Sequence, residues 1–348
     1  MSAKRYITVF AVFAGGGLLL AALLVYLIDP FFHYHMPWFG MEPVVHNERY
    51  QNAGLADHAD YDAIIVGSSM SENFDAAWFD EAFGARTLKL PYSGATVENV
   101  RIAIDRAEAA TGGTLKYVFG NLDIELLGTV DTVASPLPDY LYNRLLFDDV
   151  YYLLNKDVII EDVTYTIQQN YRGTVAPLSS AYQWYTNSIF SKEQVLKDLT
   201  LPDEFLPVPQ ETEAISDTTI TAVDRIKRLA DQYPETTFCY FYSPYSMARW
   251  YREYCKGKFL SDCDVMRYSA QKLLECENVR LYFPITYEII TDLDSYKDLG
   301  GHYGINIQYL IFEEIRDDIN RLTTDNYERY FSDFQNAVME CDFEAVFR

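Results

Sequence analysis

The stretch DAIIVGSSMSENFD, residues 62–75, constrains the fold of this chain more than any other segment. Residues 63–66 form a short continuous apolar run, which is typical of a strand buried on both faces of a parallel sheet. The glycine and two serines at 67–69 end this run, and residues 72–83 then have the pattern of a helix. The serines therefore fall where a central strand ends, at the edge where open α/β sheets collect ligands.

Ser69 has two interpretations at this point. Ser69-Met70-Ser71-Glu72 fits the capping box S-x-x-E, so Ser69 and Glu72 can simply cap the following helix. Alternatively, the Ser69 hydroxyl is a nucleophile, and the N–H groups of a helix N-terminus stabilise an anion that develops beside it.

The pattern after residue 61 alternates strand and helix, which predicts an α/β domain at 61–321 with a central parallel sheet of five strands. The expected strands are 63–66, 87–90, 115–121, 236–243 and 279–283. Within the domain, residues 124–219 form a connection long enough to predict an inserted lid or subdomain. Its aromatic residues Tyr182, Trp184 and Tyr185 are expected either to stack on sugar rings or to belong to the core.

The N-terminus contains an uncharged stretch, Tyr6 to Ile28, that as a helix is about 35 Å long and can cross a bilayer. A cleaved signal peptide is the alternative, but the bulky residues that follow favour an uncleaved anchor for 1–28. Lys4 and Arg5 predict a cytoplasmic N-terminus and an extracytoplasmic main domain. Residues 29–60 read as a juxtamembrane connector, and the acidic tail 322–348 reads as a terminal helix.

The formal net charge of −23 argues against a nucleic-acid partner and slightly favours a neutral or cationic ligand such as a sugar. The five cysteines form no CxxC pattern, so we expect no metal and no cofactor. Cys255 and Cys263 are a possible pair outside the cell. His33 and His35 share one face of an extended segment, where packing at the membrane interface is favoured over metal binding.

Four of the five histidines precede the sheet, and only His302 follows its last predicted strand. Ser69 and His302 are therefore predicted to meet at one edge of the sheet, although they are far apart in sequence. A serine nucleophile needs a base that accepts its proton, which histidine provides, and Asp298 lies close enough to orient the imidazole.

In these blocks the chain resembles the SGNH/GDSL hydrolase family, whose flavodoxin-like fold is a three-layer sandwich. The G-S-S turn at 67–69 matches the first block, and Gly94 in LPYSGAT matches the glycine of the second. The third block, G-x-N-D, has its asparagine displaced by one residue, to Asn121. The last block, Asp-x-x-His, is one residue longer here, between Asp298 and His302, so Asp294 or a backbone carbonyl is the alternative orienting group.

The resemblance extends to a group of membrane-anchored SGNH-like proteins from Gram-positive bacteria. It is carried by stretches such as DPFFHYH, NERYQNAGLADH, FYSPYSMARW and YKDLGGHYG. This group is similar in layout to the D-alanyl transfer protein of the teichoic-acid pathway and to polysaccharide O-acetyltransfer proteins.

The resemblance implies an esterase or acyltransferase that acts on a cell-envelope glycan or a teichoic-acid-like polymer, with an acyl-donor membrane protein as a possible partner. The expected catalytic residues are Ser69, His302 and Asp298, with an oxyanion hole formed by Ser69, Gly94 and Asn121. The alternative is a catalytically inactive relative that binds a glycan or a partner in an envelope-modification complex. A flavodoxin-like cofactor protein is disfavoured, because the first loop lacks a glycine-rich phosphate cradle.

Overall fold

The structure is a computed structural model that describes residues 2–129 and 136–348. Residues 2–60 and 136–181 form one compact unit, and residues 61–129 and 182–348 form a second. The predicted insertion at 124–219 is thus shared between the two units, and residues 130–135 of it lie outside the described residues.

The second unit is built on a sheet of six strands within the described residues. The strands are β1 (Ala63–Val66), β2 (Thr87–Lys89), β3 (Tyr117–Leu122), β4 (Thr237–Tyr242), β5 (Val279–Tyr282) and β6 (Arg321–Leu322). Their order is β2-β1-β3-β4-β5-β6, whose first five places follow the doubly wound order 2-1-3-4-5. All four side chains of β1 are fully buried, as the continuous apolar run predicts.

The prediction of a purely parallel five-stranded sheet is wrong, because β6 pairs antiparallel with β5. The preceding helix ends at Asp317, and Asp318 and Asn320 adopt positive φ angles of 55° and 51°. This reversal sends Arg321 and Leu322 back along β5, where they pair with Tyr282 and Leu281. A two-residue strand is too short to show an alternating pattern, which is why the sequence indicated only the end of a helix.

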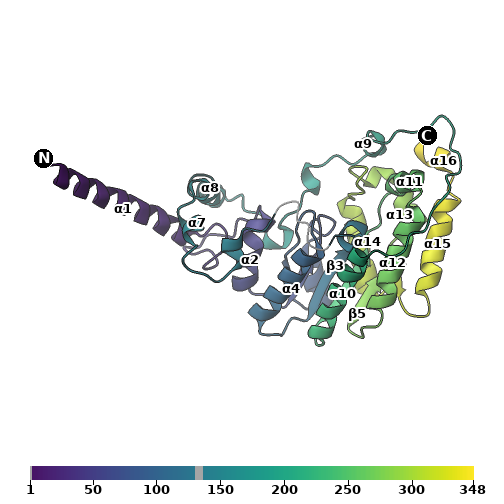
Figure 1. Ribbon diagram of the computed structural model, residues 1–348, viewed down its shortest axis with the longest axis horizontal. Coiled ribbons are helices and arrows are strands. Elements are labelled where there is room, and N and C mark those ends of the chain that lie inside the picture. Colours follow the sequence, from purple (N-terminus) through teal and green to yellow (C-terminus); the bar gives the residue numbers. More distant parts are fainter. Residues whose placement is uncertain (1, 130–135) are drawn as a thin grey trace. The chain divides into compact units, whose positions relative to one another are not determined.

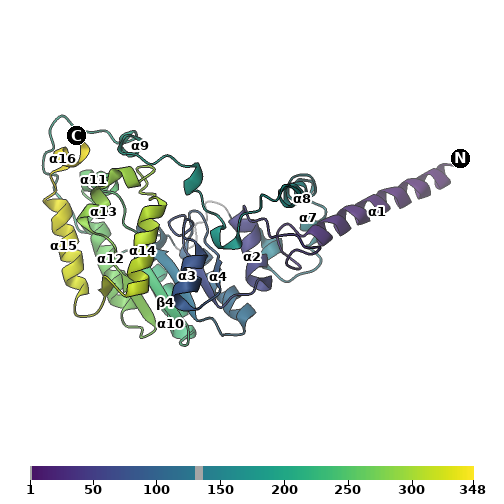
Figure 2. The same ribbon diagram turned by 180° about the vertical axis from the view of Figure 1, so that it is seen from behind.

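Helices cover both faces of this sheet. Helices α4 (Val97–Thr111), α10 (Asp217–Gln232) and α12 (Phe259–Leu273) pack in a row, and α15 (Tyr327–Met339) extends it (Figure 1). Helices α3 (Ala76–Phe83) and α14 (Ile305–Asp317) pack against each other, and Figure 2 views the unit from their side. The shorter helices are α5 (Ile124–Leu127), η3 (Tyr185–Asn187), α9 (Lys192–Leu196), α11 (Met247–Cys255), α13 (Tyr287–Thr291), η4 (Leu293–Ser295) and α16 (Phe343–Phe347).

The first unit is helical. It contains α1 (Ala3–Ile28), α2 (Glu48–His58), α6 (Asp139–Tyr142), α7 (Val150–Leu153), η1 (Val158–Asp162), α8 (Val163–Arg172) and η2 (Leu178–Ser180). Of the described helices, α1 alone is long and apolar enough to cross a membrane, with a mean hydropathy of 2.4 over its best window, and it fits a signal sequence equally well.

A buried carboxylate organises the end of α1. Asp29 closes the helix with φ 45°, and burial raises its pKa although several donors contact it. Its carboxylate accepts hydrogen bonds from the backbone N–H groups of His33 (3.0 Å), Tyr34 (2.7 Å) and His35 (2.9 Å), and from the Tyr152 hydroxyl (2.7 Å). Around it, an apolar cluster joins α1 to the segments that begin at α6 and end in α8: Val25, Phe31, Leu141, Tyr152, Val158 and Val163.

Candidate functional site

The turn after β1 is shaped by Gly67 and Asn121. Gly67 has φ 120°, and a Cβ atom at this position would lie 2.1 Å from Asn121 Oδ1. The same oxygen accepts the Ser68 backbone N–H at 3.0 Å and the Ser71 hydroxyl at 2.6 Å, while Asn121 Nδ2 donates to Ser68 Oγ at 3.1 Å. Only glycine allows β3 to approach the end of β1 this closely.

Ser68 is the buried member of the serine pair. Its hydroxyl donates to Asp123, which also accepts the Ser243 hydroxyl at 2.6 Å. Burial raises the pKa of Asp123, and the two serine hydrogen bonds oppose this effect. The Ser68 side chain is therefore committed to holding the turn.

Ser69 points the other way, toward the predicted base. Its Oγ lies 2.9 Å from Nε2 of His302, and Nδ1 of His302 lies 3.0 Å from both carboxylate oxygens of Asp298. The side chains of His302 and Asp298 are 30% and 33% exposed, so a ligand can reach this cluster from solvent. The structure thus places the three predicted catalytic residues in one chain of contacts at the carboxyl edge of the sheet.

The loop after β5 explains how His302 reaches Ser69. An isolated antiparallel bridge joins Tyr296 to Tyr303, and the Lys297 N–H donates to the carbonyl of His302 at 2.8 Å. Gly301 turns the chain between them with φ 90°. The extra residue in the block between Asp298 and His302 is absorbed by this tight turn, so the carboxylate still contacts the imidazole.

Asp298, and not Asp294, is the acid beside the imidazole. Asp294 Oδ1 accepts the backbone N–H of Lys192 at 2.9 Å, at the start of α9. Burial alone would raise the pKa of Asp298, but the hydrogen bonds and charge of His302, with the charge of Lys297, outweigh it and lower the pKa. Asp298 is therefore held as a carboxylate, the form that orients an imidazole for proton transfer.

The loop that carries Gly94 is fastened to the Ser69 turn. The Tyr92 N–H donates to the carbonyl of Gly67 at 2.9 Å, and the Ser93 hydroxyl donates to Glu72 Oε1 at 2.7 Å. Gly94 follows with φ 63° and has open space where a Cβ would lie. These contacts hold the segment that carries Gly94 against the Ser69 turn.

Both predicted capping roles are wrong, because the helix begins later than expected. Helix α3 starts at Ala76, and its N-cap is Asp75, whose carboxylate accepts the Ala77 N–H at 3.0 Å. Glu72 is almost fully buried and bonds Ser93, while Ser69 contacts His302. The irregular segment between Ser69 and α3 frees both side chains from the helix.

Trp184 was predicted only as one of several aromatic residues in the insertion, and the structure places it beside the cluster. Its Nε1–H donates to the carbonyl of Ser69 at 3.3 Å, and its ring makes a T-shaped contact with His302, with centroids 5.6 Å apart. Asn73 Oδ1 holds this segment by accepting the N–H groups of Trp184 (3.0 Å) and Tyr185 (3.2 Å). The Lys297 ammonium lies 4.5 Å from the Trp184 ring centre.

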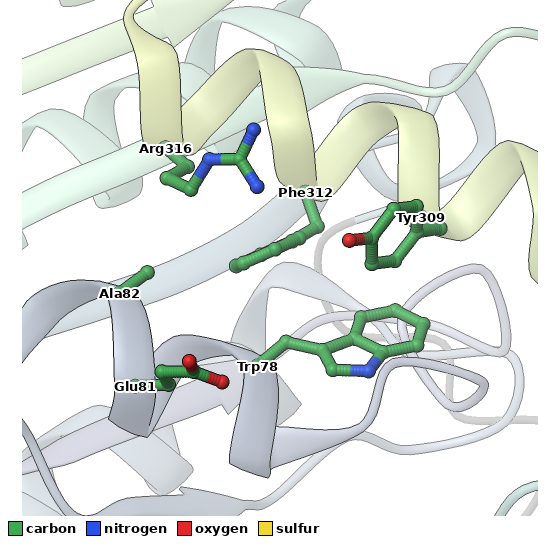
Figure 3. Close-up of a pocket in the computed structure, with 6 residues that line it drawn as sticks. All are labelled: Trp78, Glu81, Ala82, Tyr309, Phe312 and Arg316. Carbon is green, nitrogen blue, oxygen red and sulfur yellow. The ribbon is translucent and has the colours of Figure 1, made fainter.

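A separate cavity lies between α3 and α14 (Figure 3). It is lined by Trp78, Glu81, Ala82, Tyr309, Phe312 and Arg316, and so by none of the predicted catalytic residues. The Arg316 guanidinium is bound to Asp317, with its Nε 2.8 Å from Oδ1. This cavity is an aromatic crevice between two helices, and its one cation is already paired.

The remaining histidines and cysteines form no metal centre within the described residues. In the first unit, His33 Nε2 lies 3.4 Å from Asp149 Oδ1, and the His35 ring stacks on Trp38 with centroids 3.5 Å apart. All five cysteines are unpaired in the structure, so the Cys255–Cys263 disulfide considered from the sequence does not form here.

Comparisons with known proteins give little further information. No protein-family model matches the sequence, and no curated protein matches it. One solved structure, described provisionally as a platelet activating factor from Streptococcus pneumonia, is 12% identical with a TM-score of 0.38 and covers 88% of this chain and 98% of its own. A likeness this remote assigns neither a family nor an activity, so the case for function depends on the site itself.

Proposed function

We propose that this protein is an SGNH-type serine hydrolase or acyltransferase that acts on acyl esters of a cell-envelope glycan or a teichoic-acid-like polymer. The observation that carries the proposal is the unbroken chain of contacts from Ser69 Oγ to His302 and on to Asp298. The glycine turn and the doubly wound strand order support the family resemblance stated from the sequence.

In the first half-reaction, Ser69 Oγ attacks the acyl carbonyl carbon as its proton passes to His302 Nε2. The tetrahedral intermediate then collapses, the bond to the leaving alcohol breaks, and His302 returns the proton to that alcohol. Asp298 holds the imidazole in the tautomer that has Nε2 free to accept a proton. Losing the nucleophile of such a triad costs about a millionfold in kcat.

In the second half-reaction, an acceptor hydroxyl gives its proton to His302 and attacks the acyl-Ser69 ester, and Ser69 recovers its proton. Water as acceptor makes the protein an esterase, whereas a sugar hydroxyl makes it a transferase. Trp184 shields one side of the imidazole, and partial exclusion of water favours transfer.

The oxyanion is assigned to the backbone N–H groups of Ser69 and Gly94. Asn121 Nδ2 already donates to Ser68 Oγ, which leaves its second amide proton for a supporting role. Removing one oxyanion donor typically costs about 3 kcal/mol of transition-state stabilisation.

A fluorophosphonate probe, which reacts with activated serines, tests the enzyme proposal. We expect the wild-type protein to be labelled, and labelling to be lost in Ser69→Ala and His302→Ala. Ser332→Ala is the matched control, because the Ser332 hydroxyl on α15 is exposed and bonds only within its helix. If folded wild-type protein is not labelled, or if Ser69→Ala is labelled equally, the glycan-binding alternative replaces the enzyme.

The proposed location is the cell membrane, with α1 as a single-pass anchor, the N-terminus in the cytoplasm and the rest of the chain outside. Support comes from the length and hydropathy of α1 and from Lys4 and Arg5 before it. Retention of the full-length chain in carbonate-washed membranes, with the second unit cleaved by protease added outside intact cells, is the expected result. Release of a shortened soluble protein would identify α1 as a signal sequence instead.

A further inference from the structure

A run of apolar side chains in the first unit is exposed to solvent. Leu146 and Phe147 are 82% and 79% exposed, and Leu145, Val150 and Tyr151 around them are 50%, 47% and 66% exposed. We name residues 145–151 the apolar loop. These side chains lie on either side of Asp148 and Asp149. Several exposed apolar side chains on one short segment mark a surface that contacts another apolar phase.

The last two residues of the apolar loop, Val150 and Tyr151, form the first part of α7, which packs against α1. The hydroxyl of Tyr152 in α7 donates to Asp29 Oδ1 at 2.7 Å and accepts the N–H of Phe31 at 3.2 Å. Beside it, Asp149 accepts the Tyr34 hydroxyl at 2.8 Å. These buried hydrogen bonds fasten the loop at the level where α1 ends.

Other helices of the first unit also cover α1 before its C-terminal end, from Ala21 onward. Ala21 and Ala22 are half-buried and Val25 is fully buried, and the neighbouring elements are α7, η1 and α8. Figures 1 and 2 both draw α7 and α8 beside this end of α1. Ala21 lies seven residues before Ile28, a distance of roughly 10 Å along a helix.

The inference rests on the proposed function, in which α1 spans the bilayer. Because α7, η1 and α8 pack against the last turns of α1, the position of α1 then sets how deeply these three helices lie in the membrane. The apolar stretch Tyr6–Ile28 is about 35 Å long, only slightly more than a hydrocarbon core of roughly 30 Å. The last turns of α1, which α7, η1 and α8 cover, then lie at the level of the outer leaflet. Ile160 belongs to η1, which packs against α1, and its side chain is 67% exposed.

We propose that the apolar loop inserts into the outer leaflet of the bilayer beside α1, so that the first unit is a monotopic membrane-interface module as well as the end of an anchor. The occupant is assigned as lipid because α7, which carries Val150 and Tyr151, packs against the end of the proposed membrane anchor α1. Phe147 and Tyr151 have the apolar bodies that suit the boundary region, and Arg144, which directly precedes the loop, is exposed. Asp148 is only half exposed and accepts the Asn143 side-chain amide at 2.7 Å.

Spin-label accessibility in the full-length protein reconstituted into phosphatidylcholine–phosphatidylglycerol vesicles tests this inference. In a Cys255→Ser, Cys341→Ser background, single labels are placed by Phe147→Cys, by Phe13→Cys in the middle of α1, and by Leu206→Cys. Leu206 is the matched control, an apolar side chain that is 63% exposed in the second unit. Collision rates with oxygen, which concentrates in lipid, and with a water-soluble nickel complex are then compared.

We expect the ratio of oxygen to nickel collisions to be severalfold higher at positions 13 and 147 than at position 206. A lipid-like ratio at 13 with a water-like ratio at 147 overturns the inference and leaves the anchor intact. Low collision rates with both reagents at 147 also overturn it, because they mean that protein, a second copy or another partner, covers the loop. A water-like ratio at 13 instead refutes the anchor, and the inference fails with it.

If removal of the two cysteines impairs folding, Phe147→Trp in the otherwise native chain tests whether position 147 contacts lipid. Its added fluorescence, relative to wild type, is expected to be quenched by lipids brominated on the acyl chain. If the added fluorescence is equally strong in brominated and unbrominated vesicles, the inference is overturned.

Discussion

The two units of this protein each contain a functionally informative aspartate, and the two residues behave in opposite ways. Asp29 in the first unit is fully buried and accepts hydrogen bonds from three backbone N–H groups and the Tyr152 hydroxyl. Asp298 in the second unit is one-third exposed, and its carboxylate contacts the imidazole and the backbone N–H of His302. Burial raises the pKa of Asp29, whereas His302 lowers the pKa of Asp298 despite burial.

The difference shows how the surroundings of a carboxylate decide its role. Where backbone donors saturate it, as at Asp29, the acid closes a helix and joins segments that are distant in sequence, and no ligand can reach it. Where a titratable ring contacts it, as at Asp298, the acid orients that ring and leaves the opposite nitrogen facing a hydroxyl. The first arrangement stabilises structure, and the second is the one that we propose supplies chemistry.

Replacing each aspartate with asparagine should separate the two roles with the largest effect. Asp298→Asn is expected to lower kcat strongly, since loss of the orienting acid costs about 10⁴-fold in serine proteases, with little change in thermal stability. Asp29→Asn is expected to lower the unfolding free energy by roughly 3 kcal/mol, because a buried donor then faces other donors, while probe labelling persists. Ester hydrolysis and thermal unfolding measure the two effects. An equal loss of stability in both variants would contradict the assignment of a structural role to Asp29 and a catalytic role to Asp298.

Gly67→Ala tests how tightly the second unit holds Ser69, the proposed nucleophile. The added methyl group would lie 2.1 Å from Asn121 Oδ1 in a backbone conformation of φ 120°, so the turn must move or the strands must separate. We expect a loss of stability of about 2 kcal/mol or more and loss of serine labelling. Gly84→Ala, at the C-cap of α3 with φ 59° and open space around it, is the matched control. Normal labelling of Gly67→Ala would show that the turn tolerates displacement.

Ser93→Ala tests a residue of the second unit that we expect to position the backbone of the Gly94 loop rather than to contact substrate. It removes the hydroxyl that bonds Glu72 and should loosen the Gly94 loop. We expect kcat to fall about tenfold with KM little changed, as for a charge-assisted hydrogen bond worth roughly 1.5 kcal/mol. Ser93→Thr keeps the hydroxyl and should restore most of kcat. A rise in KM alone would indicate substrate contact rather than positioning of the loop.

The smallest expected effects concern the pH dependence of stability. The contributions of the two aspartates to stability should change in opposite directions as pH rises. Because the pKa of Asp298 is lowered in the folded state, its contribution to stability is present above the ordinary aspartate pKa and is lost as pH falls through the lowered value. Because the pKa of Asp29 is raised, its contribution is greatest in acid and is lost as pH rises through the raised value.

The stability difference between wild type and Asp298→Asn should therefore shrink as pH falls through the lowered pKa of Asp298, whereas that between wild type and Asp29→Asn should shrink as pH rises through the raised pKa of Asp29. Thermal unfolding of the three proteins across this range measures both trends. The same trend in both variants would contradict the opposite environments that distinguish the two sites.

Several features were predictable from the sequence because they depend on local pattern and on simple topology. The continuous apolar run at 63–66 identified a central strand, and parallel strands place their carboxyl ends on one edge. From that rule alone, Ser69 and His302 were expected to meet, and their atoms lie 2.9 Å apart. The two-residue strand β6 was missed, since it is created by pairing with β5 and not by its own pattern.

Other features depend on contacts between distant segments. Asn121 was expected to serve an oxyanion hole, and the structure uses three of its hydrogen bonds to hold Ser68 and Ser71. Trp184 lies beside His302 only because Asn73 holds its segment. The grouping of residues 136–181 with the N-terminal segment rests on bonds such as Tyr152 to Asp29, between residues 123 positions apart.

By itself the sequence determined the α/β class of the second unit, the apolar N-terminal helix and the pairing of a serine with a late histidine. These features follow from the spacing of hydrophobic residues and from the order of strands and helices along the chain. Both can be read from short stretches of sequence without knowledge of tertiary contacts. Only the tertiary structure decided which aspartate orients His302, that the helix cap is Asp75, and that an apolar loop lies beside α1. Those outcomes depend on hydrogen bonds and packing between side chains whose separation in sequence carries no local signal.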